Sequence, residues 1–215
     1  FAMLSVDGSA EIKALNGSGK SSENASSEDL RKRGLDVITS DMPDAVTIPG
    51  AVKGWHLLHS EHGNMPWKEI FEPAIEYVKS GVHVHERVAL DWSKNIGKLA
   101  QDKDTSSLFL KNGEAFKFTD KFTNPGLSEA FKSIAEEGAD GFYNGWIADD
   151  MHQKLLSIGG NHTLNDFRNA SAEWVKPITG NYRNITIHEC PPNGQGIVAL
   201  IILSILEKFD PNKML

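Results

Sequence analysis

The segment Asn16-Gly17-Ser18-Gly19-Lys20-Ser21 contains the residue types of a phosphate-binding loop. In such a loop, backbone N–H groups surround the phosphates, a lysine balances their charge, and a hydroxyl group reaches a magnesium ion. Two parts of that pattern are absent. Ala14 stands where the first glycine belongs, and polar residues follow Lys20 where an apolar helix should begin. We therefore interpret the segment as a glycine-rich turn rather than a nucleotide site.

Histidines form a second group with the chemistry to bind a ligand. His56, His59 and His62 recur at every third position, and His83 and His85 follow nearby. On a helix of 3.6 residues per turn the outer two of the first three point about 120° apart, so one metal ion could not bind all three. The HExxH pattern of zinc enzymes is also missing. We expect neither a metal site nor a cofactor.

Cys190 is the single cysteine, which excludes an intrachain disulfide and a cysteine-rich zinc site. No base stands beside it in the sequence, so we interpret it as a small packed side chain rather than a nucleophile. His188 falls on the same strand face, which leaves a thiol–imidazole pair open as an alternative. No catalytic constellation follows from these residues alone.

The composition sets the limits within which these residues act. The chain has 215 residues, of which 40% are hydrophobic and 24% charged, enough to bury a core. A formal charge of −7 argues against a nucleic-acid surface, so small molecules are the expected partners. The apolar run from 197 to 206 is too short to span a bilayer. The chain opens without Met, and we interpret it as a piece of a larger protein; the cytoplasm is our working expectation for its compartment.

The apolar pattern predicts strands at both ends and helices between them. Residues 1–6 and 9–15 flank Asp7-Gly8, a pair suited to a two-residue hairpin turn. Residues 16–44 are polar and glycine-rich, and we expect a flexible loop. Helices are expected over 49–62, 66–80, 88–99, 127–137 and 140–158.

A second hairpin is expected near the C-terminus. Residues 173–178 and 182–189 alternate apolar with polar side chains around Thr179-Gly180-Asn181. Residues 197–208 are apolar on every side, which is typical of a buried helix, and Pro211 should end it. We also expect five aromatic residues of the helical middle to pack in the core. They are Trp55, Trp67, Phe71, Tyr143 and Trp146.

Six ordered blocks of the sequence resemble motifs of the gamma-glutamyltranspeptidase family. Residues 47–55 (TIPGAVKGW) resemble its TPGTVAG segment, and residues 62–75 resemble its YG-x-LPW-x-E…L-x-PAI stretch. Residues 141–148 (GFYNGWIA) are similar to FYxGxIA, and residues 159–167 to GG-x-(I/L)T-x-EDL. Residues 177–183 (PITGNYR) are similar to P(I/L)SG-x-YRG, and residues 191–197 with Leu206-Glu207 to PPPSSGGI…NILE.

The resemblance implies an α+β fold, the αββα sandwich of N-terminal-nucleophile hydrolases. In that family one precursor cuts itself into a large and a small subunit. Residues 1–215 would be an incomplete large-subunit portion of one such domain. It would divide into 1–48 (hairpin and flexible loop), 49–170 (helical region) and 171–215 (hairpin and buried helix). The catalytic threonine, which acts as nucleophile and through its own α-amine as base, would begin the small subunit, the expected partner.

The resemblance also identifies a departure from the family. Residues 14–22 align with the family segment A-(I/L)-D-F-R-E-x-A-P, which places Ser18 where the transpeptidases carry the arginine that binds the γ-glutamyl α-carboxylate. A serine cannot make that bidentate, charged contact. The segment is instead similar to related acylases with an LNGSG sequence. We expect Asn16, Gly17, Ser18 and Lys20 to bind the substrate, a small-molecule amide or γ-glutamyl-like compound.

Two functions remain open at this point. The first is a gamma-glutamyltranspeptidase-like amidohydrolase or acyltransferase that forms an acyl-enzyme on the threonine of the small subunit. The second is a catalytically inactive paralogue that serves as a binding or scaffold protein. Self-cleavage of the precursor would separate them.

Overall fold

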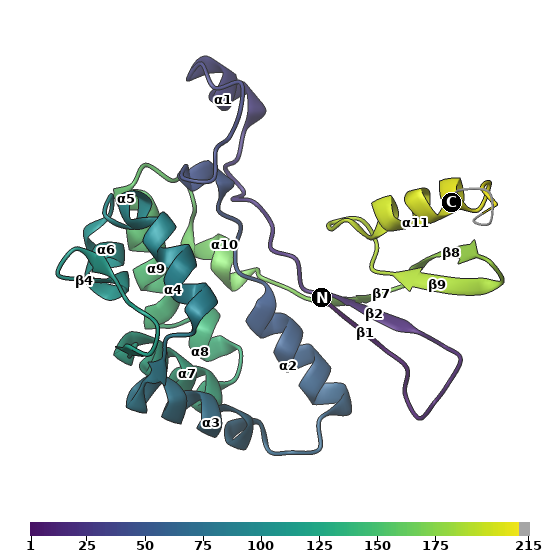
Figure 1. Ribbon diagram of the computed structural model, residues 1–215, viewed down its shortest axis with the longest axis horizontal. Coiled ribbons are helices and arrows are strands. Elements are labelled where there is room, and N and C mark those ends of the chain that lie inside the picture. Colours follow the sequence, from purple (N-terminus) through teal and green to yellow (C-terminus); the bar gives the residue numbers. More distant parts are fainter. Residues whose placement is uncertain (211–215) are drawn as a thin grey trace. The chain divides into compact units, whose positions relative to one another are not determined.

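The computed structural model describes residues 1–210 and combines helices with short β-strands (Figure 1). The chain divides into two compact units. Unit 1 consists of Phe1–Asn64 together with the chain from Phe142 onward, and unit 2 is Met65–Gly141. The mixture of elements confirms the predicted α+β class.

A three-stranded antiparallel sheet in unit 1 joins the two ends of the sequence. β1 (Ala2–Leu4) pairs with β2 (Lys13–Asn16), and β2 pairs with β7 (Glu173–Val175). The predicted first hairpin is therefore confirmed, although its second strand begins at Lys13 rather than at Ser9, so residues 5–12 connect the two strands. Asp7 and Gly8 both adopt positive φ, at 53° and 72°, as a turn of this kind requires.

The second hairpin consists of β8 (Ile178–Tyr182) and β9 (Ile185–Glu189). The predicted turn at 179–181 is wrong, because the chain reverses at Arg183 and Asn184, with φ of 49° and 67°. Gly180 instead lies within β8, where a Cβ would come 3.2 Å from Leu200 Cδ2. Its lack of a side chain serves close packing rather than a turn.

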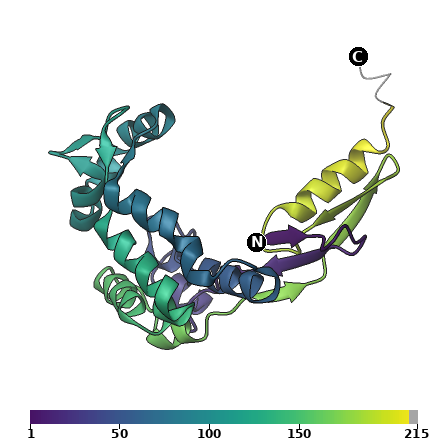
Figure 2. The same ribbon diagram turned by 90° about the horizontal axis from the view of Figure 1, so that it is seen from below.

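Helix α11 (Gly196–Leu206) lies alongside the β8–β9 hairpin and is drawn in yellow (Figure 2). We expected a buried helix, yet no residue of α11 is buried in this chain. Ile201 is 53% exposed and Ile205 54%, although the β8–β9 hairpin packs against the helix. The stop expected at Pro211 lies outside the described residues. Within residues 1–210, no helix has both the length and the apolar character needed to cross a membrane.

The helices of unit 1 surround a small core. Buried Ile48, Ala148, Leu155 and Phe167 pack together, and Phe167 is fully buried. Burying one such side chain stabilises the fold by roughly 1.5–3 kcal/mol. The core residues come from the segment before α2 (Ala51–His62), from α9 (Trp146–Ser157) and from α10 (Leu164–Arg168), whereas α1 (Ser27–Lys32) and the 3-10 turn η1 (Pro43–Ala45) have no buried residue.

The helix expected over 140–158 forms as two helices. α8 (Asp140–Tyr143) ends before Asn144, and α9 begins after Gly145, which has extended backbone. The boundary between the two units falls within α8 in the sequence. A glycine with extended backbone cannot continue a helix, which explains the break.

Unit 2 is built around the antiparallel pair α3 and α7. The predicted helices at 66–80 and 127–137 are confirmed, and the one at 88–99 divides in two at Asn95. The elements are α3 (Trp67–Ser80), β3 (Val82–His83), α4 (Glu86–Lys94), α5 (Ile96–Leu99), α6 (Lys103–Phe109), β4 (Leu110–Lys111), β5 (Glu114–Ala115), β6 (Lys121–Phe122) and α7 (Pro125–Glu137). β3 pairs with β6, and β4 with β5.

Aromatic side chains hold unit 2 together. Trp92 makes edge-on contacts with Phe109, Phe116 and Phe122, with ring centroids 5.5, 5.8 and 5.2 Å away. Between α3 and α7, Trp67 Nε1 donates a hydrogen bond to the carbonyl oxygen of Ile134 at 2.8 Å. Such contacts satisfy the one polar atom of a largely apolar side chain.

The aromatic residues expected in the core differ in burial, and Trp67 is half-buried. Phe71 and Tyr143 are buried, as predicted. Trp55 and Trp146 are 47% and 49% exposed, so the prediction is wrong for them. The buried positions of their helices lie elsewhere, at residues 52 and 54 of α2 and at residues 147, 148 and 155 of α9.

Candidate functional site

The loop that follows β2 is shaped by the side chain of Asn16. Its Oδ1 accepts a hydrogen bond from the backbone N–H of Ser18 at 3.0 Å, and its Nδ2 donates to Oδ1 of Asn193 at 3.2 Å. A carboxamide that bonds to the backbone two residues later forms the local turn typical of Asn. Asn16 thus fixes the start of the loop and connects it to the segment before α11.

This loop lies against the chain that leads into α2. The N–H of Ile48 donates to the carbonyl oxygen of Lys20 at 2.9 Å. A Cβ on Gly19 would lie 1.9 Å from the carbonyl oxygen of Ile48, and one on Gly50 would lie 2.1 Å from that of Gly17. The backbone of the loop and that of the segment before α2 can lie this close together only because Gly19 and Gly50 have no Cβ.

Tyr143 holds the start of α2 in place. Its hydroxyl donates to the carbonyl oxygen of Pro49 at 2.6 Å and accepts from the N–H of Lys53 at 3.2 Å. Burial raises the pKa of the Tyr143 hydroxyl, while the N–H groups of Lys53 and Val52 lower it by a smaller amount. The phenol stays protonated at neutral pH and can donate its hydrogen bond.

A hollow of about 200 Å³ lies beside the loop. Its walls come from the loop after β2, the start of α2 and the region of α10. The lining residues are Ser18, Gly19, Lys20, Ser21, Glu23, Ile48, Gly50, Asp166, Asn169, Ala170 and Ser171. Of the described residues that line it, Lys20 is the only cation, and it is exposed.

The carboxylate of Asp166 connects the loop to α10. Oδ1 accepts a hydrogen bond from the N–H of Glu23 at 2.7 Å, and Oδ2 accepts one from the N–H of Thr163 at 2.7 Å. The hydroxyls of Thr163 and Ser22 also reach Oδ2, at 3.1 and 3.3 Å. Burial acts to raise the pKa of Asp166, but these hydrogen bonds outweigh it and hold the pKa below the ordinary value of 3.8. Asp166 is therefore ionised at neutral pH.

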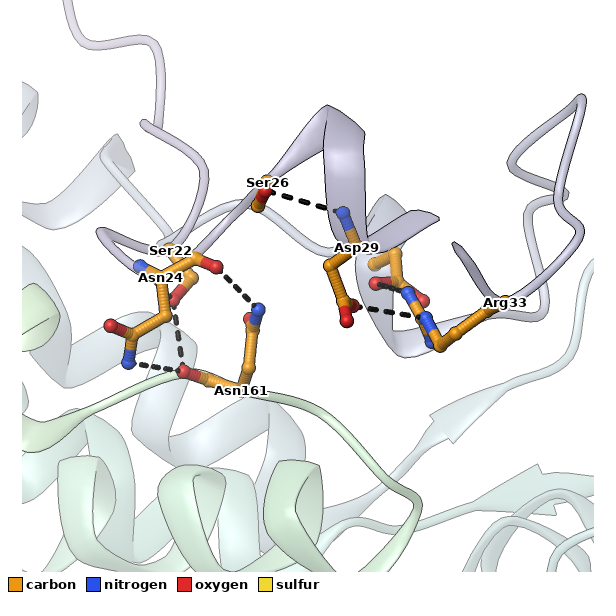
Figure 3. A network of polar contacts seen from close by, with 7 residues as sticks. Ser22, Asn24, Ser26, Asp29, Arg33 and Asn161 are labelled. Carbon is orange, nitrogen blue, oxygen red and sulfur yellow. Dashed lines mark hydrogen bonds and ion pairs between the residues drawn. The ribbon is translucent and has the colours of Figure 1, made fainter. Parts of the chain in front are cut away.

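A second set of contacts continues from the loop toward α1 (Figure 3). Asn24 and Asn161 each donate a side-chain hydrogen bond to the other's carbonyl oxygen, at 3.1 and 2.9 Å. The hydroxyl of Ser22 donates to the same carbonyl of Asn161 at 3.0 Å. Ser26 then caps α1 by accepting from the N–H of Asp29 at 3.3 Å. The residues beyond the hollow are therefore held to the segment that precedes α10.

The structure places the four predicted substrate-binding residues in one loop. Ser18 and Lys20 line the hollow, whereas Asn16 forms the turn and Gly17 permits the close approach to Gly50. Their role in binding stays a prediction.

Three neighbours of this loop were not predicted from the sequence, namely Glu23, Asp166 and Asn193. Thr163 and Asp166 form a complete capping box at the start of α10, a pattern visible in the sequence as a threonine followed three residues later by an acid. The bond from Asp166 to Glu23 joins residues 143 positions apart, and no local pattern indicates it.

The prediction that residues 16–44 form a loop throughout is wrong, because α1 lies within this range and η1 begins in it. Residues 17–26 have no helix or strand. In residues 1–210, no group of three or more His, Cys, Asp or Glu side chains is arranged to hold a metal ion. Cys190 is a free, half-buried cysteine whose Sγ lies 4.0 Å from the carbonyl oxygen of Ala2.

Comparison with known proteins identifies relatives over most of the chain. A family model described as gamma-glutamyltranspeptidase matches residues 1–214. The glutathione hydrolase-like YwrD proenzyme of Bacillus subtilis is 32% identical over 199 residues, which cover 93% of this chain and 38% of that protein. The glutathione hydrolase proenzyme of Escherichia coli is 33% identical over 168 residues, 77% of this chain and 29% of that protein. The chain thus spans about a third of the length of these curated relatives.

Solved structures show the same similarity. A gamma-glutamyltranspeptidase from Helicobacter pylori superposes with a TM-score of 0.91 at 25% identity, over 99% of this chain and 62% of that chain. A cephalosporin acylase from Bacillus halodurans superposes with a TM-score of 0.86 at 31% identity, over 93% of this chain and 39% of that chain.

Proposed function

The chain belongs to the gamma-glutamyltranspeptidase family, and we propose on that basis that it is the large-subunit part of an amidohydrolase of this kind. Residues 1–215 would contribute to one αββα domain of the N-terminal-nucleophile type. The reactive threonine would belong to a small subunit released from the same precursor, and the acyl group of a small-molecule amide would be transferred to it.

Helix α11 is the observation that carries this proposal. Its sequence, GIVALIILSIL, contains no charged residue, and its side chains face solvent on the sides that the β8–β9 hairpin leaves uncovered. Contiguous exposed apolar surface of this kind marks an interface. We assign its occupant as the small subunit, since the curated relatives that the chain matches are named proenzymes and are about two and a half times as long.

The proposed reaction proceeds through an acyl-enzyme. The threonine hydroxyl attacks the amide carbonyl while the α-amino group of the same threonine takes its proton. Backbone N–H groups stabilise the tetrahedral oxyanion, whose collapse breaks the C–N bond and releases the amine with that proton. Water then adds to the acyl-threonine ester, and the free acid leaves. In this scheme the present chain supplies the wall that holds the acyl side chain.

We assign the hollow beside the loop as that wall. Its volume of about 200 Å³ is below the range of roughly 300–1,000 Å³ typical of a whole drug-sized ligand, so it suits the acyl part alone. Ser18 offers a neutral hydroxyl where the family's arginine would offer two charge-assisted hydrogen bonds, each worth about 1.5–3 kcal/mol. We therefore propose that acyl groups other than γ-glutamyl are preferred.

Mass spectrometry of the purified full-length protein tests the proposed subunit organisation. Two polypeptides, the lighter one beginning with threonine, would support the enzyme. A single intact polypeptide would contradict it and favour the inactive paralogue, which retains the fold as a binding or scaffold protein.

Hydrolysis of p-nitroanilides tests the proposed specificity. We expect butyryl-p-nitroanilide to be cleaved with a higher kcat/KM than γ-glutamyl-p-nitroanilide. Ser18→Arg should raise kcat/KM for the γ-glutamyl compound by about tenfold, because one charge-assisted hydrogen bond returns. Ser21→Arg is the matched control, since it adds the same charge to the same hollow at another position. Equal gains from both variants, or fast γ-glutamyl turnover by the unmodified protein, would contradict the assignment of Ser18.

A further inference from the structure

We propose that Asp166 is a positioning residue whose carboxylate holds the end of the loop and thereby places Ser18 and Lys20 at the wall of the hollow. The kinetic part of this inference rests on the proposed function. The structural part does not, because it concerns how the loop is held within this chain.

Several hydrogen bonds fix the loop, and Asp166 provides one of them near its end. Asn16 bonds to the N–H of Ser18, and Ile48 bonds to the carbonyl oxygen of Lys20. The carboxylate of Asp166 then receives the N–H of Glu23 at 2.7 Å. Without this last bond, the residues after Lys20 would be held to α10 only through side chains.

The two oxygens of Asp166 have separate tasks. Oδ2 receives the N–H of Thr163 and the hydroxyls of Thr163 and Ser22, so it caps α10. Oδ1 receives the N–H of Glu23, so it holds the loop. The capping box is complete without Oδ1.

This division predicts a specific result for Asp166→Asn. A carboxamide has one accepting oxygen and one NH2 group, which only donates. The oxygen should take the Oδ2 position, where the N–H of Thr163 donates and two hydroxyls, each sharing its one proton with another acceptor, also lie within reach. The NH2 group would then face the N–H of Glu23 as a second donor. The variant should keep the cap of α10 and lose the attachment of the loop.

One titratable group beside Asp166 adds a second contact between the loop and α10. The carboxylate of Glu23 accepts from the hydroxyl of Thr163 at 2.9 Å and from Nδ2 of Asn165 at 3.3 Å, so it is directed at α10 as well. Lys20 lines the hollow with both acids. A backbone N–H can donate to a carboxylate or to a carbonyl oxygen. The N–H of Glu23 donates to Oδ1 of Asp166.

Hydrogen exchange of the full-length protein, followed by mass spectrometry, is the first test. In Asp166→Asn, peptides that cover residues 18–24 should exchange about tenfold faster, whereas peptides of α9 and α10 should be unchanged. Asp36→Asn is the matched control, since it removes the same charge from an exposed position between α1 and η1. Unchanged exchange over 18–24, or equal acceleration in α9 and α10, would overturn the proposal.

Steady-state kinetics with butyryl-p-nitroanilide is the second test. Loss of loop placement should raise KM by about tenfold and change kcat by less than about twofold, as expected when ground-state binding is lost. A fall in kcat with unchanged KM would overturn the positioning role. If the unmodified protein cleaves no anilide, the proposed function fails, and the exchange experiment alone decides this inference.

A second variant keeps the proposal testable if Asp166→Asn does not fold. Ser22→Ala removes one hydroxyl that donates to Oδ2 of Asp166 and to the carbonyl of Asn161, and leaves the carboxylate in place. Exchange over 18–24 should then rise by about threefold or more, since the variant loses these bonds together with the one that Ser22 Oγ accepts from the N–H of Asn24. No increase would contradict the proposal.

Discussion

Replacing Gly19 with alanine should disrupt the loop that carries Ser18 and Lys20. The new Cβ would lie 1.9 Å from the carbonyl oxygen of Ile48, 2.9 Å from its carbonyl carbon and 3.0 Å from Oγ1 of Thr47. Two of these atoms are backbone and cannot rotate away. The loop must therefore move by about 1 Å or more, which lengthens the 2.9 Å bond from the N–H of Ile48 to the carbonyl oxygen of Lys20 beyond hydrogen-bonding range.

The expected loss of stability is about 2–4 kcal/mol. The hydrogen bond accounts for roughly 0.5–1.5 kcal/mol and the displaced, overpacked backbone for roughly 1–3 kcal/mol. Thermal unfolding of the full-length protein measures the effect. Gly97→Ala is the matched control, because its Cβ would meet no atom within 4 Å and alanine favours the surrounding helix α5 by up to about 1 kcal/mol. An unfolding temperature for Gly19→Ala equal to that of the control would refute the close approach described here.

Three further changes test other parts of the structure. Tyr143→Phe removes the donor to the carbonyl oxygen of Pro49 and should cost about 1–3 kcal/mol in thermal unfolding, whereas a change below about 0.5 kcal/mol would contradict the bond. The pKa of Asp166 is lower in the folded chain than its ordinary value of 3.8, so its contribution to stability is complete well above that pH and is lost as the pH falls through the folded value. Acid titration of unfolding should show a smaller loss in Asp166→Asn than in the unmodified protein, and equal losses would argue against the network. Ile201→Asp, at a position 53% exposed in this chain, should weaken retention of the lighter polypeptide in size-exclusion chromatography, and unchanged retention would argue against α11 as the interface.

The helical part of the fold was predictable because its signals are local. The apolar spacing of residues 66–80 and the glycine at 81, which adopts φ of 87°, predict α3 with its end. The break between α8 and α9 was missed, because Tyr143 and Ile147 keep a four-residue spacing across Asn144 and Gly145. Periodicity does not reveal a change in backbone direction that preserves the apolar face.

The second hairpin shows a different limit of local patterns. Gly180 predicts a turn by composition, but packing against Leu200 requires a glycine within the strand. Arg183 and Asn184 form the turn although arginine seldom adopts positive φ. Tertiary packing, which a local sequence window does not contain, decides between these two positions.

The candidate site was predictable only where its residues are consecutive. Ser18 and Lys20 were identified through the resemblance of residues 14–22 to a family segment, and both line the hollow. Asp166 and Asn193 reach the loop from distant parts of the chain, at separations of 143 and 177 residues for the bonded pairs. Likewise, the exposure of α11 does not follow from its composition, because an apolar helix looks the same whether its partner lies within this chain or in another polypeptide.

The most direct measurement of the central claim is the mass of each polypeptide after the full-length protein is mixed with butyryl-p-nitroanilide and quenched in acid within one turnover. The proposed acyl-enzyme predicts that the lighter polypeptide gains the mass of one butyryl group on its first residue, a threonine, while the polypeptide that contains residues 1–215 stays unmodified. A butyryl group on the latter polypeptide, or turnover without any acylated intermediate on the lighter one, would contradict the account.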